Sequence, residues 1–404
     1  MTTAPVHRGS RLYVKKFGGT SVGSLERIGV VAEQIAEAYR LGEHQVIVCS
    51  AMAGETNRLY ALAQQLGGEA PARELDMLVA TGEQVSIALL CIALQQRGVN
   101  ARSLLASQVP IRTSSMHGAA DIEQIDSHHL QQLLHAGIVP VVAGFQGVDA
   151  AGNITTLGRG GSDTTAVALA AALAADECQI FTDVDGVFTT DPAIEPTARK
   201  LDCISFTEML ALARHGAKVL HPDSVATAQR YRVPLRVLSS FTPGQGTLIE
   251  EAMPATSRVT GIAIHRHQAL LTHANPLQAH ELRQQIQALL RHCGVSFETD
   301  DSASNLWFGV QQQQYSQLVA AMAQLNSSAI SCKCFPSLSR LSVVAGVVPS
   351  ISRLTQNIDD LLEGEGIDVK LTSCSTAALS VWVDEANTDR AVRVLHHGFG
   401  LNKV

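Results

Sequence analysis

The first 250 residues alternate short apolar segments with longer segments whose apolar positions recur at helical spacing. Residues 12–17 predict a strand, and residues 24–40 predict an amphipathic helix directly after it. Strands that alternate with helices in this way are typical of an α/β fold with a mainly parallel sheet. Further strands are expected at 44–52, 138–145, 178–184 and 233–241, and further helices at 78–96, 121–135, 164–176 and 205–213.

The most informative stretch is 155–192, which predicts a loop, a helix, a strand and an acidic loop in that order. The glycine-rich turn 158–161 precedes Ser162 and Asp163, which are both favourable helix N-cap residues. An alanine-rich helix follows, and a buried strand then leads into the loop 183–186. Because open α/β sheets bind ligands beyond the carboxyl ends of their strands, we expect part of a binding site here.

The pattern changes after a polar, proline-containing segment at 250–258, which we interpret as a linker. Two shorter units follow it, each with a strand, a helix, two strands and a second helix. The first helix of each unit is expected at 277–292 and at 352–364. The sequence therefore predicts two regions, 1–252 and 259–404, of which the second consists of tandem α+β modules.

Composition limits the class of protein further. Of the 404 residues, 46% are hydrophobic and 17% are charged, and the net charge is −7. An acidic chain without a basic stripe is not expected to bind nucleic acid. The eight cysteines are scattered without a CxxC pair, which favours reduced thiols in the cytoplasm. No segment approaches 18 consecutive apolar residues and the start lacks a signal-peptide core, so we expect no membrane association.

Two glycine-rich loops at strand ends have the chemistry of anion sites. Gly18 and Gly19 follow the first strand, and Lys16 precedes them, unlike the lysine of a Walker A loop. Arg159 lies within the second glycine turn, where its planar guanidinium suits a carboxylate or a phosphate. From the residues alone, a lysine that protects a sheet edge and a tight turn before a core helix are alternative interpretations.

Several motifs together resemble those of aspartate kinases, within the amino acid kinase family. They are KFGGTSVGS near the start of the chain and, in the central stretch, TTLGRGGSDTTAVALAAAL and TDVDGVFTTDP. The resemblance is strong over residues 12–250 and covers the rest only through the order of its elements. It implies an α/β three-layer sandwich of the amino-acid-kinase type with a mainly parallel sheet, followed by two ferredoxin-like α+β modules of the ACT kind.

This resemblance implies an ATP-dependent phosphotransferase. Aspartate kinases transfer the γ-phosphoryl group of MgATP to the β-carboxylate of L-aspartate, which begins the synthesis of lysine, threonine, methionine and diaminopimelate. The expected cofactors are ATP and Mg²⁺, with the metal carried by ATP rather than held by protein ligands. An acceptor carboxylate with a pKa of about 3.9 is already ionised at neutral pH, so no general base is required.

The resemblance also implies roles for individual residues. The expected catalytic residues are Lys16, Gly18, Gly19 and Asp163. Aspartate is expected to be bound by Ser50, Thr56, Glu83, Arg159 and Ser162. ATP is expected to be bound by Lys16, Gly18, Gly19, Thr182, Asp183, Asp185, Phe188, Asp191 and Lys218. Without the resemblance, Glu83 could equally cap a helix and Asp185 could equally shape a turn.

Assembly and regulation follow only from the C-terminal modules. Paired ACT modules imply a homo-oligomer, and in feedback-inhibited relatives they bind lysine or threonine. The loop 273–278 lacks glycine and contains Pro276, and the later loop with Gly346 also holds Pro349, so we expect weak or absent inhibition. A non-catalytic amino-acid sensor and a kinase with another acceptor, such as glutamate, acetylglutamate or a carbamate, are alternative hypotheses.

Overall fold

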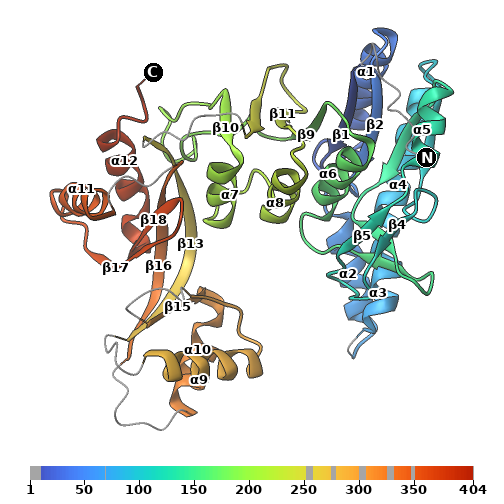
Figure 1. Ribbon diagram of the computed structural model, residues 1–404. Helices are drawn as coiled ribbons and strands as arrows, with labels where there is room; N and C mark the ends of the chain where they lie inside the picture. Colours follow the sequence, from blue (N-terminus) through green and yellow to red (C-terminus); the bar gives the residue numbers. More distant parts are fainter. Residues whose placement is uncertain are drawn as a thin grey trace. The chain divides into compact units, whose positions relative to one another are not determined.

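The computed structural model describes residues 11–68, 70–251, 258–273, 279–299, 306–324, 332–346 and 351–403. The chain forms two compact units. Figure 1 colours the chain along its sequence, from blue at the N-terminus to red at the C-terminus. The first unit holds the residues up to Val187 together with 200–210 and 218–253. The second holds 188–199, 211–217 and the residues after the linker. The second unit therefore includes two short segments from before the linker, whereas the sequence predicted one boundary. The roles of the two regions stay a prediction.

An eight-stranded sheet forms the centre of the first unit, in the order β10-β12-β11-β9-β1-β2-β6-β3. Its strands are β1 (Leu12–Phe17), β2 (His44–Cys49), β3 (Ala101–Leu104), β6 (Val139–Ala143), β9 (Glu177–Thr182), β10 (Cys203–Ser205), β11 (Leu235–Ser239) and β12 (Thr247–Glu250). Neighbouring strands are parallel except β11 and β12. The carboxyl ends of β1, β2, β6 and β9 therefore meet at one edge of the sheet.

Helices cover both faces of this sheet, which confirms the predicted α/β sandwich. On one face, α1 (Leu25–Arg40) and α4 (Thr81–Gln95) share an apolar core with Phe17. Side chains alternate between the faces of a strand, so Lys16 points to the opposite face, where α6 (Gly161–Leu173) packs against β1. Other helices are α2 (Glu55–Gln65), α3 (Ala72–Val79), α5 (His128–His135), α7 (Phe206–Arg214) and α8 (Pro222–Tyr231).

A second, four-stranded sheet in this unit has the order β5-β4-β7-β8. Its strands are β4 (Ile111–Thr113), β5 (Ile122–Ile125), β7 (Gln146–Val148) and β8 (Ile154–Thr156). The predicted helix over 121–135 is therefore wrong in its first half. Residues 122–125 pair antiparallel with β4 as an edge strand, and the helix begins only at His128. Strand pairing of this kind is a tertiary effect, which the polar pattern of the segment does not reveal.

The glycine-rich turn starts α6 earlier than predicted. Gly160 occupies the N-cap position with a left-handed backbone (φ 72°), and no side chain caps the helix. Ser162 and Asp163 lie in the first turn, so the prediction that they cap α6 is wrong. A left-handed residue favours glycine, which explains why glycine rather than a polar cap occupies this position. Both polar side chains are consequently left for other contacts.

Helices α3 and α4 follow each other directly, so Ala72–Gln95 form a helical run of 24 residues, within which an 18-residue window has a mean hydropathy of 1.9. By length and composition alone this run would be able to cross a membrane, although Glu83 and Gln84 interrupt it and it holds no 18 consecutive apolar residues; the expectation of no membrane association stays a prediction. Half of that window is buried inside the protein, where Ile87, Leu90 and Leu94 belong to the core shared with α1. Such burial is typical of a core helix in an α/β sandwich.

One six-stranded antiparallel sheet organises the second unit, in the order β14-β15-β13-β16-β18-β17. Its strands are β13 (Val259–His273), β14 (Phe297–Glu298), β15 (Leu306–Gln311), β16 (Cys332–Ala345), β17 (Val369–Cys374) and β18 (Ala378–Asp384). Its helices are α9 (Ala279–His292), α10 (Tyr315–Gln324), α11 (Ile351–Glu363) and α12 (Thr388–Gly398), with short 3₁₀ turns η2 (Gln312–Gln314) and η3 (Glu385–Asn387). The predicted order of elements in both modules is confirmed.

The two modules complete one sheet instead of forming two. The long strands β13 and β16 pair from Val259 opposite Ala345 to His273 opposite Cys332. One apolar core contains residues of α9 and α10, and another contains residues of α11 and α12 together with Ile194 of the segment 188–199. The loop residues 274–278 and 347–350, on which the prediction of weak inhibition rests, lie outside the described residues.

Candidate active site

A cavity of about 840 Å³ lies in the first unit, beside the carboxyl ends of β1, β2 and β6. Its wall includes the loops after these strands, the glycine-rich turn after β8, and residues of α2, α4 and α6. Chain segments that are distant in the sequence thus meet around one space. The predicted residues that line it are Lys16, Gly19, Ser50, Thr56, Glu83, Arg159, Ser162 and Asp163.

Lys16 and Asp163 form a nearly buried charge pair in this cavity. The ammonium nitrogen of Lys16 lies 2.6 Å from Oδ1 of Asp163, and the two side chains are 11% and 13% exposed. Oδ1 of Asp163 makes no hydrogen bond to any described residue, so the attraction between opposite charges holds the pair. Because an ammonium group has three donors, Lys16 keeps donors for an anionic ligand.

Lys15 is turned away from this pair. Its ammonium nitrogen lies 2.9 Å from Oε2 of Glu43, in the loop between α1 and β2. Adjacent residues of a strand point to opposite faces, so the two lysines serve different surroundings although both are nearly buried. This arrangement is the one expected for neighbouring residues of the strand that the sequence predicted over 12–17.

The loop after β1 offers one free amide rather than two. The Gly18 amide donates a hydrogen bond to the carbonyl of Phe181 at 3.1 Å, so it is engaged within the sheet. The Gly19 amide has no acceptor among the described residues. A Cβ atom at Gly19 would lie 3.0 Å from the carbonyl oxygen of Ala51, which explains why glycine is required there. Of the two glycine amides that were expected to face a phosphate, only that of Gly19 is therefore available.

Glu83 is a buried carboxylate in the first turn of α4, with only 3% of the residue exposed. Its Oε1 accepts a hydrogen bond from the amide of Ala51 at 2.9 Å, whereas Oε2 is buried without a hydrogen-bond partner among the described residues. Burial raises the pKa of Glu83 to about 7, and the hydrogen bond from Ala51 opposes this shift. An unpartnered carboxylate oxygen at a cavity wall is suited to a cationic group such as an ammonium.

The raised pKa of Glu83 makes stability depend on pH. Between pH 4.5 and about 7 the Glu83 carboxyl keeps its proton in the folded protein but loses it in the unfolded chain. The contribution of Glu83 to the free energy of unfolding therefore falls as the pH rises through that range. Glu83→Gln removes the effect. We expect the unfolding free energy of the variant, relative to the unsubstituted protein, to increase by up to about 3 kcal/mol between pH 4.5 and 8.

Thermal or denaturant unfolding of the unliganded proteins across this range measures the difference. Glu74→Gln is the control, because Glu74 is an exposed carboxylate on α3 that pairs only with Arg73 among the described residues. Its difference from the unsubstituted protein should stay constant with pH. Parallel curves for both variants would contradict the assigned pKa.

Arg159 is the exposed cation of the cavity. It lies between Gly158 and Gly160, whose backbones are both left-handed with φ of 74° and 72°. A Cβ atom at Gly160 would lie 2.3 Å from the side chain of His221, so the turn that carries Arg159 packs directly against the start of α8. Arg159 forms no ion pair with a described residue, and its guanidinium is thus available to an anion.

The residues predicted to bind ATP do not line this cavity, apart from Lys16 and Gly19. Thr182 ends β9, and its hydroxyl donates to Asp183 at 3.1 Å, while the hydroxyl of Thr242 donates to Asp185. These residues and exposed Lys218 belong to the first unit, whereas Phe188 and Asp191 belong to the second. Their assignment to ATP stays a prediction.

Comparison with known proteins identifies the family. The model of the amino acid kinase family matches residues 11–239. The aspartokinase of Pseudomonas aeruginosa is 45% identical, over 97% of this chain and 98% of its own length. The chain belongs to the amino acid kinase family and, within it, to the aspartokinases. The aspartokinase of Geobacillus stearothermophilus is 40% identical over 96% of this chain and 97% of its own length.

The fold of this chain is also similar to that of a solved aspartokinase. The crystal structure of E. coli aspartokinase III in complex with aspartate and ADP, an R-state, has a TM-score of 0.77 to this chain. The match covers 96% of this chain and 99% of the solved chain at 25% identity. The resemblance inferred from the motifs is therefore confirmed over the C-terminal modules as well.

Sequence analysis missed part of the cavity wall of this aspartokinase. Asn57, Tyr60 and Gln64 line it from α2. Their spacing of three and four residues places them on one helix face, and this polar stripe was a usable signal. Gly118 and Phe145 also line the cavity, but they come from the loops after β4 and β6, which only the tertiary fold brings there.

A protein-bound metal site is not evident in the described part of the chain. No group of three or more His, Cys, Asp or Glu residues there is arranged to hold a metal ion. This finding leaves Mg²⁺ as an expectation that depends on the nucleotide.

Proposed function

We propose that this chain transfers the γ-phosphoryl group of MgATP to the β-carboxylate of L-aspartate. The observation that carries the proposal is that Arg159 and Glu83 line the same cavity, where among the described residues Arg159 forms no ion pair and Oε2 of Glu83 has no hydrogen-bond partner. These charges complement the α-carboxylate and the α-ammonium of an amino acid. The full-length similarity to aspartokinases supports the same conclusion.

The amino acid would be held at its backbone groups, which leaves its side chain for the reaction. Arg159 would bind the α-carboxylate through two parallel hydrogen bonds, and Glu83 would bind the α-ammonium. An ammonium at Glu83 favours the ionised carboxylate, which opposes the effect of burial. Ser50, Thr56 and Ser162 line the same cavity and would supply further hydrogen bonds.

The reaction itself requires charge neutralisation more than proton transfer. An oxygen of the ionised β-carboxylate forms a bond to the γ-phosphorus while the bond from that phosphorus to the ADP oxygen breaks, which yields 4-phospho-L-aspartate and ADP. Lys16 and the free Gly19 amide would stabilise the negative charge on the transferring group. Asp163 would hold the Lys16 ammonium in place. Mg²⁺ would enter with ATP and supply further positive charge at the phosphates.

The nucleotide would lie near the loops after β1 and β9. Gly18 would shape the first loop through its hydrogen bond to Phe181 rather than bind phosphate. Thr182, Asp183, Asp185, Phe188, Asp191 and Lys218 are proposed to contact ATP. The support for these six residues is the resemblance of the TDVDGVFTTDP motif and of the segment around Lys218 to the family, not a described contact.

ADP release measured with a panel of amino acids tests the proposed function. We expect MgATP turnover with L-aspartate and little with glutamate, acetylglutamate or a carbamate. Turnover that depends on one of those acceptors would replace aspartate as the substrate. Absence of turnover with every acceptor, together with binding of an amino acid by calorimetry, would favour the alternative of a non-catalytic sensor.

We also propose that the second unit assembles the chain into a cytoplasmic homo-oligomer without strong feedback control. The loop 273–278 lacks a glycine that would let backbone amides approach an effector closely. Aspartate turnover should therefore fall by less than about twofold with lysine or threonine at millimolar concentration. Initial rates with each amino acid at subsaturating aspartate measure the effect. Strong inhibition by either amino acid would overturn this proposal and leave the kinase assignment intact.

A further inference from the structure

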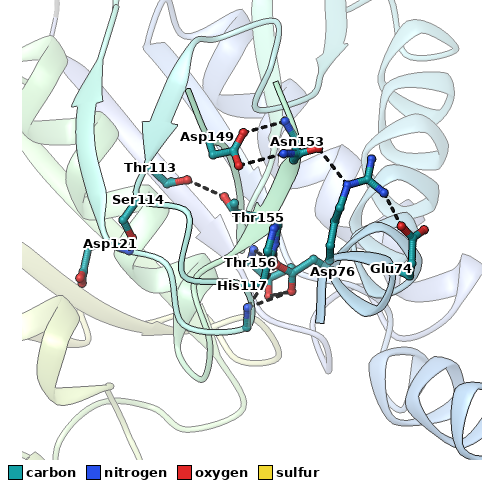
Figure 2. Close-up of polar contacts among 12 residues, drawn as sticks. Glu74, Asp76, Thr113, Ser114, His117, Asp121, Asp149, Asn153, Thr155 and Thr156 are labelled. Atoms are coloured by element: carbon teal, nitrogen blue, oxygen red, sulfur yellow. Dashed lines mark hydrogen bonds and ion pairs between the residues drawn. The ribbon is translucent and has the colours of Figure 1, made fainter. Parts of the chain in front are cut away.

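Asp76 is a buried carboxylate that the proposed reaction does not use. It lies on α3 with only 2% of the residue exposed. Figure 2 shows its side chain directed at two chain segments that are distant in sequence. Its Oδ2 lies 2.7 Å from Nδ1 of His117, and both oxygens accept from the Gly118 amide at 3.1 Å. Thr156 donates its amide at 3.1 Å and its hydroxyl at 2.5 Å.

The two segments held by Asp76 both lead into the cavity. The loop between β4 and β5 contains Gly118, which lines the cavity. Thr156 ends β8, three residues before Arg159. The segments also touch each other, because the Ala120 amide donates to the Thr156 carbonyl at 2.9 Å. One carboxylate thus anchors two neighbouring parts of the wall.

Asp76 also links these segments to Glu83. The two carboxylates are seven residues apart on the nearly continuous helical run of α3 and α4, so they lie on the same face. Their surroundings differ: Asp76 accepts hydrogen bonds at both oxygens, whereas Oε2 of Glu83 has no partner among the described residues. The run therefore carries one carboxylate that organises the wall and one that faces the cavity.

We propose that Asp76 is a positioning residue for the amino-acid substrate. By holding Thr156 and Gly118 against α3, it sets the place of Arg159 relative to Glu83 without touching the substrate. The inference rests on the proposed function, because it assumes that Arg159 and Glu83 bind the two backbone groups of aspartate. Loss of this anchor should weaken aspartate binding selectively, since a small displacement separates the two charges from their targets.

The structure offers a matched control in Asp149, at the turn between β7 and β8 of the same small sheet. Asp149 is 8% exposed and accepts from the amides of Ala151 and Asn153 at 3.0 and 2.8 Å. It also accepts from Nδ2 of Asn153 at 3.0 Å, as Figure 2 shows. Like the bonds of Asp76, these bonds include backbone amide donors, but they are fewer and stay within one turn, and neither Asp149 nor these partners line the cavity.

Steady-state kinetics of Asp76→Asn and Asp149→Asn in the full chain test the proposal. In D76N one acceptor oxygen is replaced by an NH2 group, which cannot accept a hydrogen bond from a backbone amide, so the anchor is weakened at nearly constant volume. We expect the KM for aspartate to rise by about 10- to 100-fold in D76N while the KM for ATP changes by less than about twofold. In D149N neither KM should change. Equal effects in the two variants, or equal changes in both KM values of D76N, would overturn the proposal.

A second pair of variants covers the case in which D76N does not fold. Thr156→Val removes the hydroxyl donor with little change of shape, and Thr156→Ser restores it. We expect T156V to raise the KM for aspartate several-fold, by about 3- to 10-fold, and T156S to stay near the original value. No difference between these two variants would count against the anchor.

Hydrogen exchange separates this inference from the proposed function. In D76N, or in T156V if D76N does not fold, amides of residues 114–120 and 157–161 should exchange faster than in the unsubstituted protein. The same amides in D149N should be unchanged. If the unsubstituted protein shows no aspartate turnover, the proposed function fails, but this difference still supports the anchor. Unchanged exchange at both segments would refute it whatever the activity.

Discussion

Replacing Lys16 with methionine is expected to lower kcat by about 10³-fold while the KM for aspartate changes little. The ammonium of Lys16 is nearly buried beside Asp163 at the end of β1, where it would face the transferring phosphoryl group. Charge on that group builds up mostly in the transition state, so loss of the cation affects the chemical step more than binding. Single-turnover and steady-state rates with MgATP and aspartate measure the effect.

Lys15→Met provides the control for this experiment. Lys15 is equally buried and also ion-paired, but its partner is Glu43 on the other side of the strand. The kcat of the Lys15→Met variant should stay within about twofold of that of the unsubstituted protein. Because Lys16→Met leaves Asp163 as an unpaired charge, circular dichroism must first show that the variant is folded. Similar kinetics of the two variants would mean that Lys16 has no special role.

Replacing Arg159 with lysine is expected to reduce kcat/KM for aspartate by about 10²- to 10³-fold, with the Kd for ATP nearly unchanged. The substitution keeps the positive charge but removes the planar pair of donors that fits a carboxylate. Gly160 packs against His221 and Gly158 lies close to Gly118, so the backbone is not expected to shift and bring a lysine ammonium closer. Kinetics with aspartate and calorimetric titration with ATP separate the two effects.

Arg58→Lys distinguishes loss of this clamp from loss of any guanidinium near the cavity. Arg58 lies on α2, next to the cavity-lining Asn57, and pairs with Glu55 through bonds of 2.9 and 2.7 Å. It does not itself line the cavity, so its substitution should leave the kinetics unchanged. Near-normal aspartate kinetics in R159K would remove Arg159 from the substrate site.

The sequence predicted those parts of the site that depend on local pattern. Lys16, Gly19 and Ser50 lie at or just beyond strand ends, where the strand pattern and the glycines locate them, whereas the role of Glu83 followed from the resemblance to aspartate kinases. Parallel pairing of β1 with β2 and β9 then brings these ends to one edge without further information. The order of elements in both C-terminal modules was predictable for the same reason.

The rest depended on contacts between distant segments. Asp76 looks like an ordinary helical aspartate until the fold brings His117 and Thr156 to it. Residues 122–125 resemble a helix until β4 offers a pairing partner. The Gly18 amide looked available until the carbonyl of Phe181 accepted its hydrogen bond. To predict each of these features, one must know which distant segment the residue contacts in the folded protein, and the local sequence pattern does not contain that information.

The second unit includes residues 188–199 and 211–217, which precede the linker, and this restricts how the two regions could be separated or recombined. A domain that begins and ends once can be moved by a single recombination event at a linker. Here a break at the linker would leave residues 188–199 and 211–217 on the N-terminal fragment, although they belong to the second unit. The C-terminal fragment would then lack Ile194 of its own core. Residues on both sides of the linker thus build the C-terminal core, so a C-terminal fragment that also carries residues 188–217 is expected to be more stable than one that begins at the linker.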